Sequence, residues 1–94
     1  DYPDAALEAR ILIQETGVND AVAGQLVQLA AVARKLKGHG LVEGISTRLL
    51  VYAATLIHAD VAARDACRMA LVRPLTDDAD IRATLDHAID AVFG

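Results

Sequence analysis

The chain has 94 residues, of which 54% are hydrophobic and 3% aromatic, and its formal net charge at pH 7 is -4. This length provides one domain with a substantial core, and a core made of Ala, Leu, Val and Ile suits closely packed helices. The negative charge argues against a nucleic-acid backbone as partner, and the scarcity of aromatic residues excludes a stacking platform for bases.

The first predicted helix runs from about Asp4 to Thr16, because its apolar residues recur with the helical period. Pro3 precedes it, where a missing N–H costs nothing, and Gly17 is expected to end it. Three residues are expected to form its buried face: Leu7, Ile11 and Leu12.

The second predicted helix begins after Asn19 as N-cap and runs to about Leu36 or Lys37. Its buried stripe consists of apolar residues at spacings of three and four: Val22, Leu26, Leu29, Ala33 and Leu36. Three basic residues lie in its last turn: Arg34, Lys35 and Lys37. We interpret them as C-terminal capping charges that complement the helix dipole. Gly38 and Gly40 then predict a flexible connection.

The third predicted helix runs from about Ser46 to His58, and Gly44 breaks the segment before it. Either Ser46 or Thr47 is expected to be its N-cap, with a hydroxyl that accepts a hydrogen bond from a free backbone N–H. The helix is apolar almost all round, which is typical of a buried helix. Its few polar residues follow one line: Arg48, Tyr52, Thr55 and His58 or Ala59.

Arg48 heads this line in the first turn of the third helix. The positive end of the helix dipole disfavours a cation there by roughly 0.3–1 kcal/mol unless an anion lies nearby. Free N–H groups and an arginine directed at one point resemble an anion site whose ligand comes from elsewhere. Local pattern alone favours a simpler alternative, a surface ion pair between Glu43 and Arg48 that contributes less than about 1 kcal/mol.

The last part of the chain predicts two more helices. Asp60 is expected to cap a short helix from about Val61 to Val72, and Thr76 or Asp77 a longer one from about Asp78 to Phe93. The residues expected to point inward are Ala66, Cys67, Ala70, Leu71, Ile81, Leu85, Ala88, Ile89 and Val92. The chain is therefore expected to form a single domain, a compact all-α bundle of about five helices.

Several kinds of chemistry have no motif in this chain. His39, His58 and His87 lack metal-ligand spacing, so no metal site is expected. No Gly-x-x-x-x-Gly-Lys-Ser/Thr phosphate loop occurs, so this segment alone should hydrolyse nothing.

The lone Cys67 excludes an intrachain disulfide and indicates a reducing compartment. No apolar run approaches the roughly 20 residues of a membrane span and no leader opens the chain, so we expect a soluble, cytoplasmic protein without a membrane partner.

Three stretches of the sequence together resemble a known family. The first is Tyr2-Pro3-Asp4 with Glu8 and Ile11 in the following helix. The second is Glu-Gly-Ile-Ser-Thr-Arg-Leu-Leu at 43–50, and the third is Ala-Leu-Val-Arg-Pro-Leu-Thr-Asp-Asp at 70–78. Over nearly its whole length, the chain resembles the C-terminal part of CbbQ/NirQ/NorQ-type ATPases, which belong to the MoxR class of AAA+ proteins.

This resemblance implies the helical lid of an AAA+ module whose ATP-binding core lies outside the chain. Arg48 matches the sensor-2 arginine, which reaches the γ-phosphate of ATP in its own or a neighbouring subunit. Ser46, Thr47 and Arg48 are thus the residues expected at the nucleotide, with ATP and Mg²⁺ as cofactors of the full-length protein. Arg64 and Arg73 are candidates for contacts between subunits.

The resemblance also implies a hexameric ring that uses ATP to remodel a client protein. CbbQ-type members act with a von Willebrand factor A-domain partner to reactivate Rubisco, whereas NorQ-type members help to mature nitric oxide reductase. The segment Leu-Ala-Ala-Val-Ala-Arg-Lys-Leu-Lys at 29–37 favours the Rubisco branch.

Two alternatives from other classes remain at this stage. A free-standing helical adaptor would bind a partner helix and no nucleotide, and the sequence upstream would discriminate it through the presence or absence of a phosphate loop. Binding of DNA through a helix-turn-helix is disfavoured by the net charge and by the apolar third helix.

Overall fold

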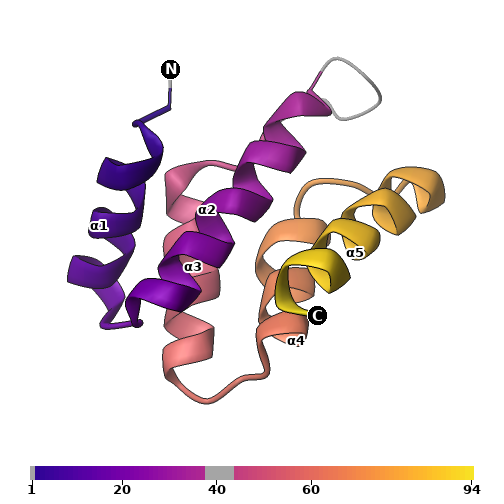
Figure 1. The fold of residues 1–94 in the computed structure, drawn as a ribbon. Helices are drawn as coiled ribbons and strands as arrows, with labels where there is room; N and C mark the ends of the chain where they lie inside the picture. The colour runs from indigo at the N-terminus through magenta and orange to yellow at the C-terminus, as the bar shows by residue number, and fades with distance from the viewer. Residues whose placement is uncertain (1, 38–43) are drawn as a thin grey trace.

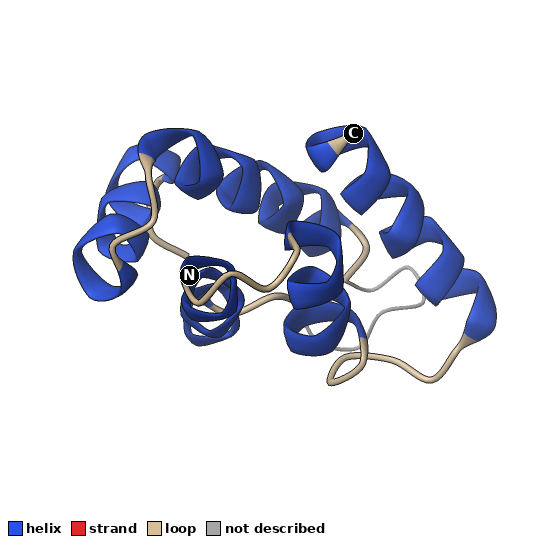
Figure 2. Ribbon diagram, turned by 90° about the horizontal axis from the view of Figure 1, so that it is seen from below, coloured by secondary structure: helices blue, strands red, loops and turns tan. Residues whose placement is uncertain are grey.

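The computed structural model describes residues 2–37 and 44–94 and is an all-α bundle, as predicted (Figure 1). Its elements in chain order are α1 (Ala5–Thr16), α2 (Asp20–Lys35), α3 (Thr47–His58), α4 (Ala63–Cys67), the π-helical turn η1 (Arg68–Val72) and α5 (Ala79–Phe93). The helix α1 packs against α2 and α3, whereas α5 packs against α2, α4 and η1. The helices labelled in Figure 1 are seen from below in Figure 2. The connection predicted around Gly38 and Gly40, like His39, lies outside the described residues.

Local capping explains where the first two helices begin. The Asp4 carboxylate accepts a hydrogen bond from the Leu7 N–H at 2.8 Å, and the Asn19 side chain accepts one from the Val22 N–H at 2.8 Å. Gly17 ends α1 in the left-handed conformation, with a φ of 84° that glycine adopts without steric cost. Both predicted helices and the Asn19 and Gly17 caps are therefore confirmed.

The start predicted for the fourth helix is wrong, because Asp60 ends α3 instead of capping the next helix. Asp60 has a φ of 71°. Its N–H donates to the Ile57 carbonyl at 3.0 Å, and the Val61 N–H donates to the Leu56 carbonyl at 3.0 Å. This pair of hydrogen bonds is a Schellman motif, which satisfies the last carbonyls of α3. The following helix begins only at Ala63, after an N-cap residue without a side-chain hydrogen bond.

The caps predicted for the last helix are also wrong by one or two residues. The Asp78 carboxylate accepts hydrogen bonds from the N–H groups of Asp80 and Ile81, at 2.8 and 3.1 Å. The Thr76 hydroxyl instead accepts from the Asp78 N–H at 3.0 Å, within the turn that leads into α5. A carboxylate at the N-cap of α5 also complements the positive end of its dipole.

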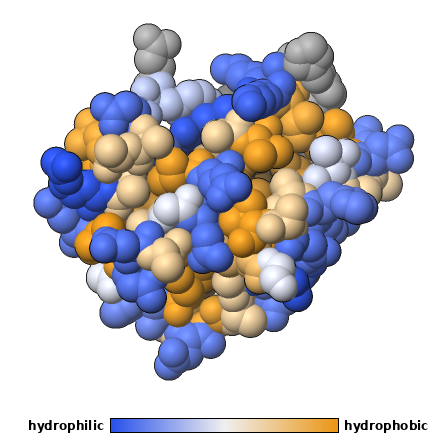
Figure 3. All heavy atoms as spheres, viewed as in Figure 1, coloured by the Kyte–Doolittle hydropathy of each residue, from blue (hydrophilic) through white to orange (hydrophobic). Residues whose placement is uncertain are grey.

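The core is aliphatic and draws on every helix. Its largest fully buried apolar side chains are Leu12, Leu26, Leu29, Ile45, Leu50, Leu71, Leu85 and Ile89. On α1 the predicted buried face is only partly correct, because Leu7 is 45% exposed and Glu8 is buried instead. At the surface shown in Figure 3, apolar residues lie between polar ones across the whole face. Within the described residues, no helix has the length and apolarity needed to cross a membrane.

Candidate functional site

The start of α3 is the point at which the sequence predicts an anion site. Ser46 has an extended backbone, with φ of -78° and ψ of 160°, and its hydroxyl accepts a hydrogen bond from the Leu49 N–H at 3.2 Å. Ser46 is therefore the N-cap, and Thr47 is the first helical residue. This resolves the two alternatives that the sequence leaves open.

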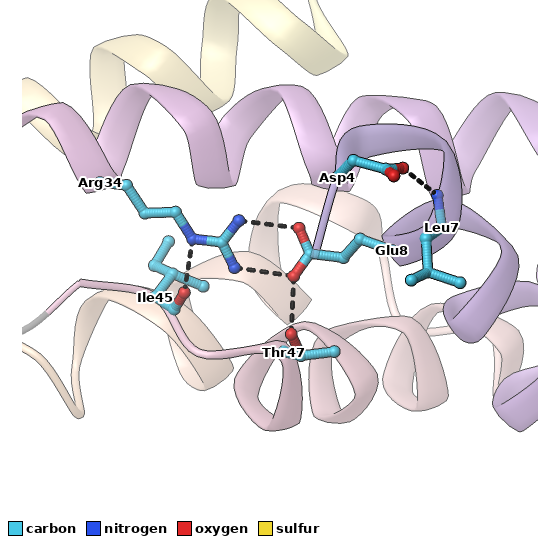
Figure 4. A network of polar contacts seen from close by, with 6 residues as sticks. All are labelled: Asp4, Leu7, Glu8, Arg34, Ile45 and Thr47. Atoms are coloured by element: carbon cyan, nitrogen blue, oxygen red, sulfur yellow. Dashed lines mark hydrogen bonds and ion pairs between the residues drawn. The ribbon is translucent and has the colours of Figure 1, made fainter. Parts of the chain in front are cut away.

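The Thr47 hydroxyl is directed into the protein, towards a buried carboxylate. It donates a hydrogen bond to Oε2 of Glu8 at 2.7 Å (Figure 4). Its proton is thus already engaged within the domain, so Thr47 can contribute its backbone N–H, but not that proton, to a ligand. Its place among the nucleotide-contacting residues stays a prediction.

Glu8 is held by an arginine from α2. Two guanidinium nitrogens of Arg34, Nη1 and Nη2, each lie 2.7 Å from an oxygen of the Glu8 carboxylate. The Arg34 and Glu8 side chains are 14% and 1% exposed, respectively. The third nitrogen of Arg34, Nε, donates to the Ile45 carbonyl at 2.9 Å, so the guanidinium joins α1, α2 and the segment before α3 (Figure 4).

Our interpretation of Arg34 as a C-terminal capping charge is therefore wrong. Arg34 lies four residues after Ala30, which is completely buried, so it continues the inward line of α2. A guanidinium that enters a protein interior requires a paired carboxylate and satisfied N–H groups. Glu8 and the Ile45 carbonyl supply these partners.

Tyr2 covers the outer side of this ion pair. Its ring lies over the Arg34 guanidinium, with 3.7 Å from the guanidinium carbon to the ring centroid, which is cation–π geometry. The Tyr2 hydroxyl lies against Gly44, where a Cβ atom would collide with it. We refer to Tyr2, Glu8, Arg34, Gly44, Ile45 and Thr47 as the Glu8 network.

Two opposing effects set the pKa of the Glu8 carboxyl. Burial raises the pKa, because the charged form loses hydration. The hydrogen bonds from Arg34 and Thr47 and the charge of Arg34 lower it, and together they outweigh burial. The pKa of Glu8 consequently lies below its ordinary value, and the carboxylate is ionised at neutral pH.

Arg48 lies on the exposed side of α3, one residue after Thr47. Among residues 2–37 and 44–94, no side chain forms an ion pair with it. The alternative partner Glu43 lies outside the described residues. The buried carboxylate of Glu8 binds Arg34, so it does not neutralise Arg48. The other members of the predicted polar line, Tyr52, Thr55 and His58, are exposed as well.

The two arginines predicted to contact other subunits have different surroundings. Arg64 Nε lies 3.2 Å from an oxygen of Asp90 on α5, and both side chains are about half-exposed. Arg73 is exposed in the turn after η1. Neither lies in the Glu8 network, and their role at a subunit interface stays a prediction.

The metal-ligating and thiol side chains in residues 2–37 and 44–94 were the other candidates for a site. No three His, Cys, Asp or Glu side chains in the described part of the chain gather as a metal site would require. Cys67 is completely buried, and burial raises the pKa of its thiol to about 12. It therefore remains a protonated thiol in the core, as its inward position on the helix predicts.

Comparison with known proteins gives the family. A family model described as "CbbQ/NirQ/NorQ C-terminal" matches residues 8–92. The chain belongs to this family. The match includes Glu8, Arg34 and the whole start of α3, and it confirms the resemblance drawn from the three sequence segments.

Three relatives illustrate the membership. The chain is 52% identical to Protein CbbQ of Hydrogenophilus thermoluteolus over 93 residues, which are 99% of the chain and 35% of that protein. It is 48% identical to Denitrification regulatory protein NirQ of Pseudomonas aeruginosa, over 96% of the chain and 35% of that protein. It is 42% identical to Protein NorQ of Paracoccus denitrificans, over the full chain and 35% of that protein. The chain thus spans about a third of the length of these relatives.

Sequence reasoning about this CbbQ/NirQ/NorQ C-terminal domain missed the Glu8 network. A signal for it exists, because Glu8 precedes the buried Leu12 by four residues and Arg34 follows the buried Ala30 by four. One acidic and one basic residue on the inward lines of two neighbouring helices indicate a buried ion pair. The bond from Thr47 has no such signal, because it depends on how α1 and α3 pack.

Proposed function

We propose that this domain is the helical lid of an AAA+ ATPase and that Arg48 contacts a phosphate group of ATP bound by the rest of the protein. The observation that supports this most directly is the contrast between two arginines. Arg34 is neutralised by the buried Glu8, whereas Arg48 is exposed at the N-terminus of α3 without an ion-pair partner among the described residues. The chain matches only 35% of the length of each of two relatives, so the remainder of such a protein has room for the proposed ATP-binding core.

The chemistry of this helix end suits a phosphate. A guanidinium can donate two parallel hydrogen bonds to phosphate oxygens, and it offsets charge that develops during phosphoryl transfer. Backbone N–H groups in the first turn, including those of Thr47 and Arg48, add donors that the Ser46 hydroxyl does not occupy. ATP and Mg²⁺ are bound by the full-length protein, and this domain contributes Arg48 from its own or a neighbouring subunit.

Replacing Arg48 by alanine in the full-length protein tests the proposal. We expect ATP turnover to fall roughly 100-fold or more, because an arginine that stabilises transition-state charge has effects of this order. The helical content should not change, because Arg48 is exposed and outside the Glu8 network. The matched control is Arg10→Ala, which removes another exposed arginine, from α1.

A steady-state ATPase assay and circular dichroism on all three proteins are sufficient. Unchanged turnover in Arg48→Ala, or an equal loss in Arg10→Ala, would contradict the proposed role.

For the whole protein, we propose a hexameric ring that remodels a client with a von Willebrand A-domain partner, and we favour Rubisco as the client. Two observations support Rubisco as the client. One is the segment at 29–37, and the other is the 52% identity with the CbbQ relative, against 48% for a NirQ and 42% for a NorQ. Nitric oxide reductase is the alternative client. Reactivation of inhibited Rubisco by the full-length protein and its partner, compared with maturation of nitric oxide reductase, decides between them.

A further inference from the structure

We propose that Glu8, Arg34 and Thr47 are positioning residues for Arg48, and that Tyr2 ties their network to the segment that precedes α1. This inference rests on the proposed role of Arg48 at a phosphate. It assigns a purpose to an ion pair between the buried Glu8 and Arg34, whose side chain is only 14% exposed.

The first support is that two hydrogen bonds of the network reach the residues on either side of the N-cap of α3. Arg34 Nε binds the carbonyl of Ile45, the residue before the N-cap. Glu8 Oε2 binds the hydroxyl of Thr47, the residue after the N-cap. Both sides of Ser46 are thus fixed to α1 and α2, and Arg48 follows directly. The network therefore sets the position from which the long Arg48 side chain extends.

The second support is the kind of interaction used. A buried ion pair gains little stability over well-packed apolar side chains, because both charges lose their hydration. Its hydrogen bonds are directional, however, and the planar guanidinium of Arg34 here engages Nε, Nη1 and Nη2 at once. Such an arrangement tolerates less displacement than an apolar contact would. An arginine that must meet a phosphate requires this precision, since a shift of about 1 Å in a reacting group can cost 100-fold in rate.

The third support is the contact made by Tyr2. The ring packs on the Arg34 guanidinium and the hydroxyl packs on Gly44, so residue 2 contacts both α2 and the segment before α3. Displacement of the chain at Tyr2 would therefore disturb the same guanidinium that holds Ile45. The entry of the domain and the start of α3 are mechanically connected through Arg34.

The test is a double-mutant cycle in the full-length protein, with ATPase kcat as the measured quantity. Thr47→Val removes the hydroxyl and keeps the branched shape, whereas Thr47→Ser keeps the hydroxyl. We expect kcat to fall roughly 10- to 100-fold in Thr47→Val and to recover in Thr47→Ser. In the Arg48→Ala background, Thr47→Val should change kcat by less than about twofold, because the hydroxyl then has no Arg48 guanidinium to position.

The control variant is Thr84→Val, because the exposed Thr84 hydroxyl on α5 donates to the Asp80 carbonyl of its own helix. Thermal unfolding of every variant shows whether the domain remains folded. A further readout is hydrogen exchange of the Leu49 and Leu50 amides, which should become faster in Thr47→Val and remain unchanged in Thr84→Val.

The outcomes are distinguishable. Equal losses from Thr47→Val in both backgrounds would assign the hydroxyl a merely structural role and overturn the inference. No loss in either background would also overturn it, while leaving the role of Arg48 intact. If Arg48→Ala itself has no effect on kcat, the proposed function fails and the positioning inference fails with it.

Discussion

At the scale of single residues, the domain contains two arginines of opposite character. Arg34 is largely buried, with a side chain 14% exposed, and its three nitrogens are satisfied by Glu8 and Ile45. Arg48 is exposed at the positive end of a helix dipole, where an anion is the natural complement. The difference follows from the side of the helix on which each residue lies. Sequence neighbours do not distinguish them, because both lie close to apolar residues.

The Glu8 carboxylate should make the stability of the domain depend on pH. Its pKa is lowered in the folded protein from the ordinary value of 4.5. The stabilisation is therefore fully present above about pH 4.5 and is lost as the pH falls through the lower, folded-state pKa. Glu8→Gln should destabilise the 94-residue domain by roughly 3–5 kcal/mol at pH 7, because the Arg34 charge loses its partner.

Urea unfolding followed by circular dichroism between pH 7 and pH 3 measures this effect. The difference in unfolding free energy between the wild type and Glu8→Gln should shrink below about pH 4.5. Glu15→Gln, an exposed position on the same helix, should behave as the wild type. A pH-independent difference would show that ionised Glu8 is not the source of the stability.

At the scale of elements, α3 is fixed by its surroundings at one end and by its own backbone at the other. Its C-terminus ends in the Schellman motif at Asp60, which requires only local hydrogen bonds. Its N-terminus carries a local cap from Ser46, but the segment before it lies against Arg34 and Tyr2. Local chemistry defines where α3 begins, and tertiary contacts define where that point lies in space.

Gly44 tests how tightly Tyr2 is packed against this segment. Gly44→Ala should destabilise the domain by about 0.5–1.5 kcal/mol, because the added methyl group collides with the Tyr2 hydroxyl and forces the half-exposed ring to shift. Adding Tyr2→Phe should restore most of that loss. The next nearest atoms, Arg34 Cγ and Tyr2 Cζ, both lie 3.5 Å from the place that the methyl group would take, which is ordinary van der Waals contact.

Gly24 provides the matched control. It lies within α2 with no atom near the place of an added Cβ, so Gly24→Ala should stabilise the domain by about 0.5–1 kcal/mol through helix propensity. Urea unfolding of the wild type, Gly44→Ala, Gly44→Ala with Tyr2→Phe, and Gly24→Ala gives the comparison. Failure of Tyr2→Phe to rescue Gly44→Ala would mean that the hydroxyl is not the obstacle.

At the scale of the whole molecule, α5 is attached by an apolar face and by several polar contacts. Leu85 and Ile89 enter the core, Arg64 pairs with Asp90, and Gln25 donates to the Val92 carbonyl at 3.2 Å. The exposed pairs contribute under about 1 kcal/mol each, so burial holds α5 in place. Arg73, in the turn before α5, is exposed and available to another molecule.

The proposed ring gives Arg73 a testable role. Arg73→Glu in the full-length protein should weaken assembly, because reversing a charge at an interface places like charges together. The fold should be unaffected, since the side chain is exposed. Light scattering after size-exclusion chromatography reports the oligomeric state, with Arg10→Glu as the control. A ring that persists unchanged would remove Arg73 from the predicted interface.

The sequence by itself determined the all-α class, a bundle of about five helices, most of the inward-facing positions and the family. These properties depend on helical periodicity, on caps such as Asn19 and Gly17, and on short segments that can be recognised in one dimension. The same local rules identified Arg48 at the head of α3. They assigned Asp60 to the start of the fourth helix instead of the end of α3, because a residue between two helices can end the first or begin the second.

Only the tertiary structure decided that Glu8 is buried, that Arg34 rather than Arg48 neutralises it, and that Thr47 donates its hydroxyl inward. Glu8 and Arg34 are 26 positions apart in the chain, and Glu8 and Thr47 are 39 positions apart. No local pattern specifies such a pairing, because it depends on how three helices pack and which side chains their packing excludes from water.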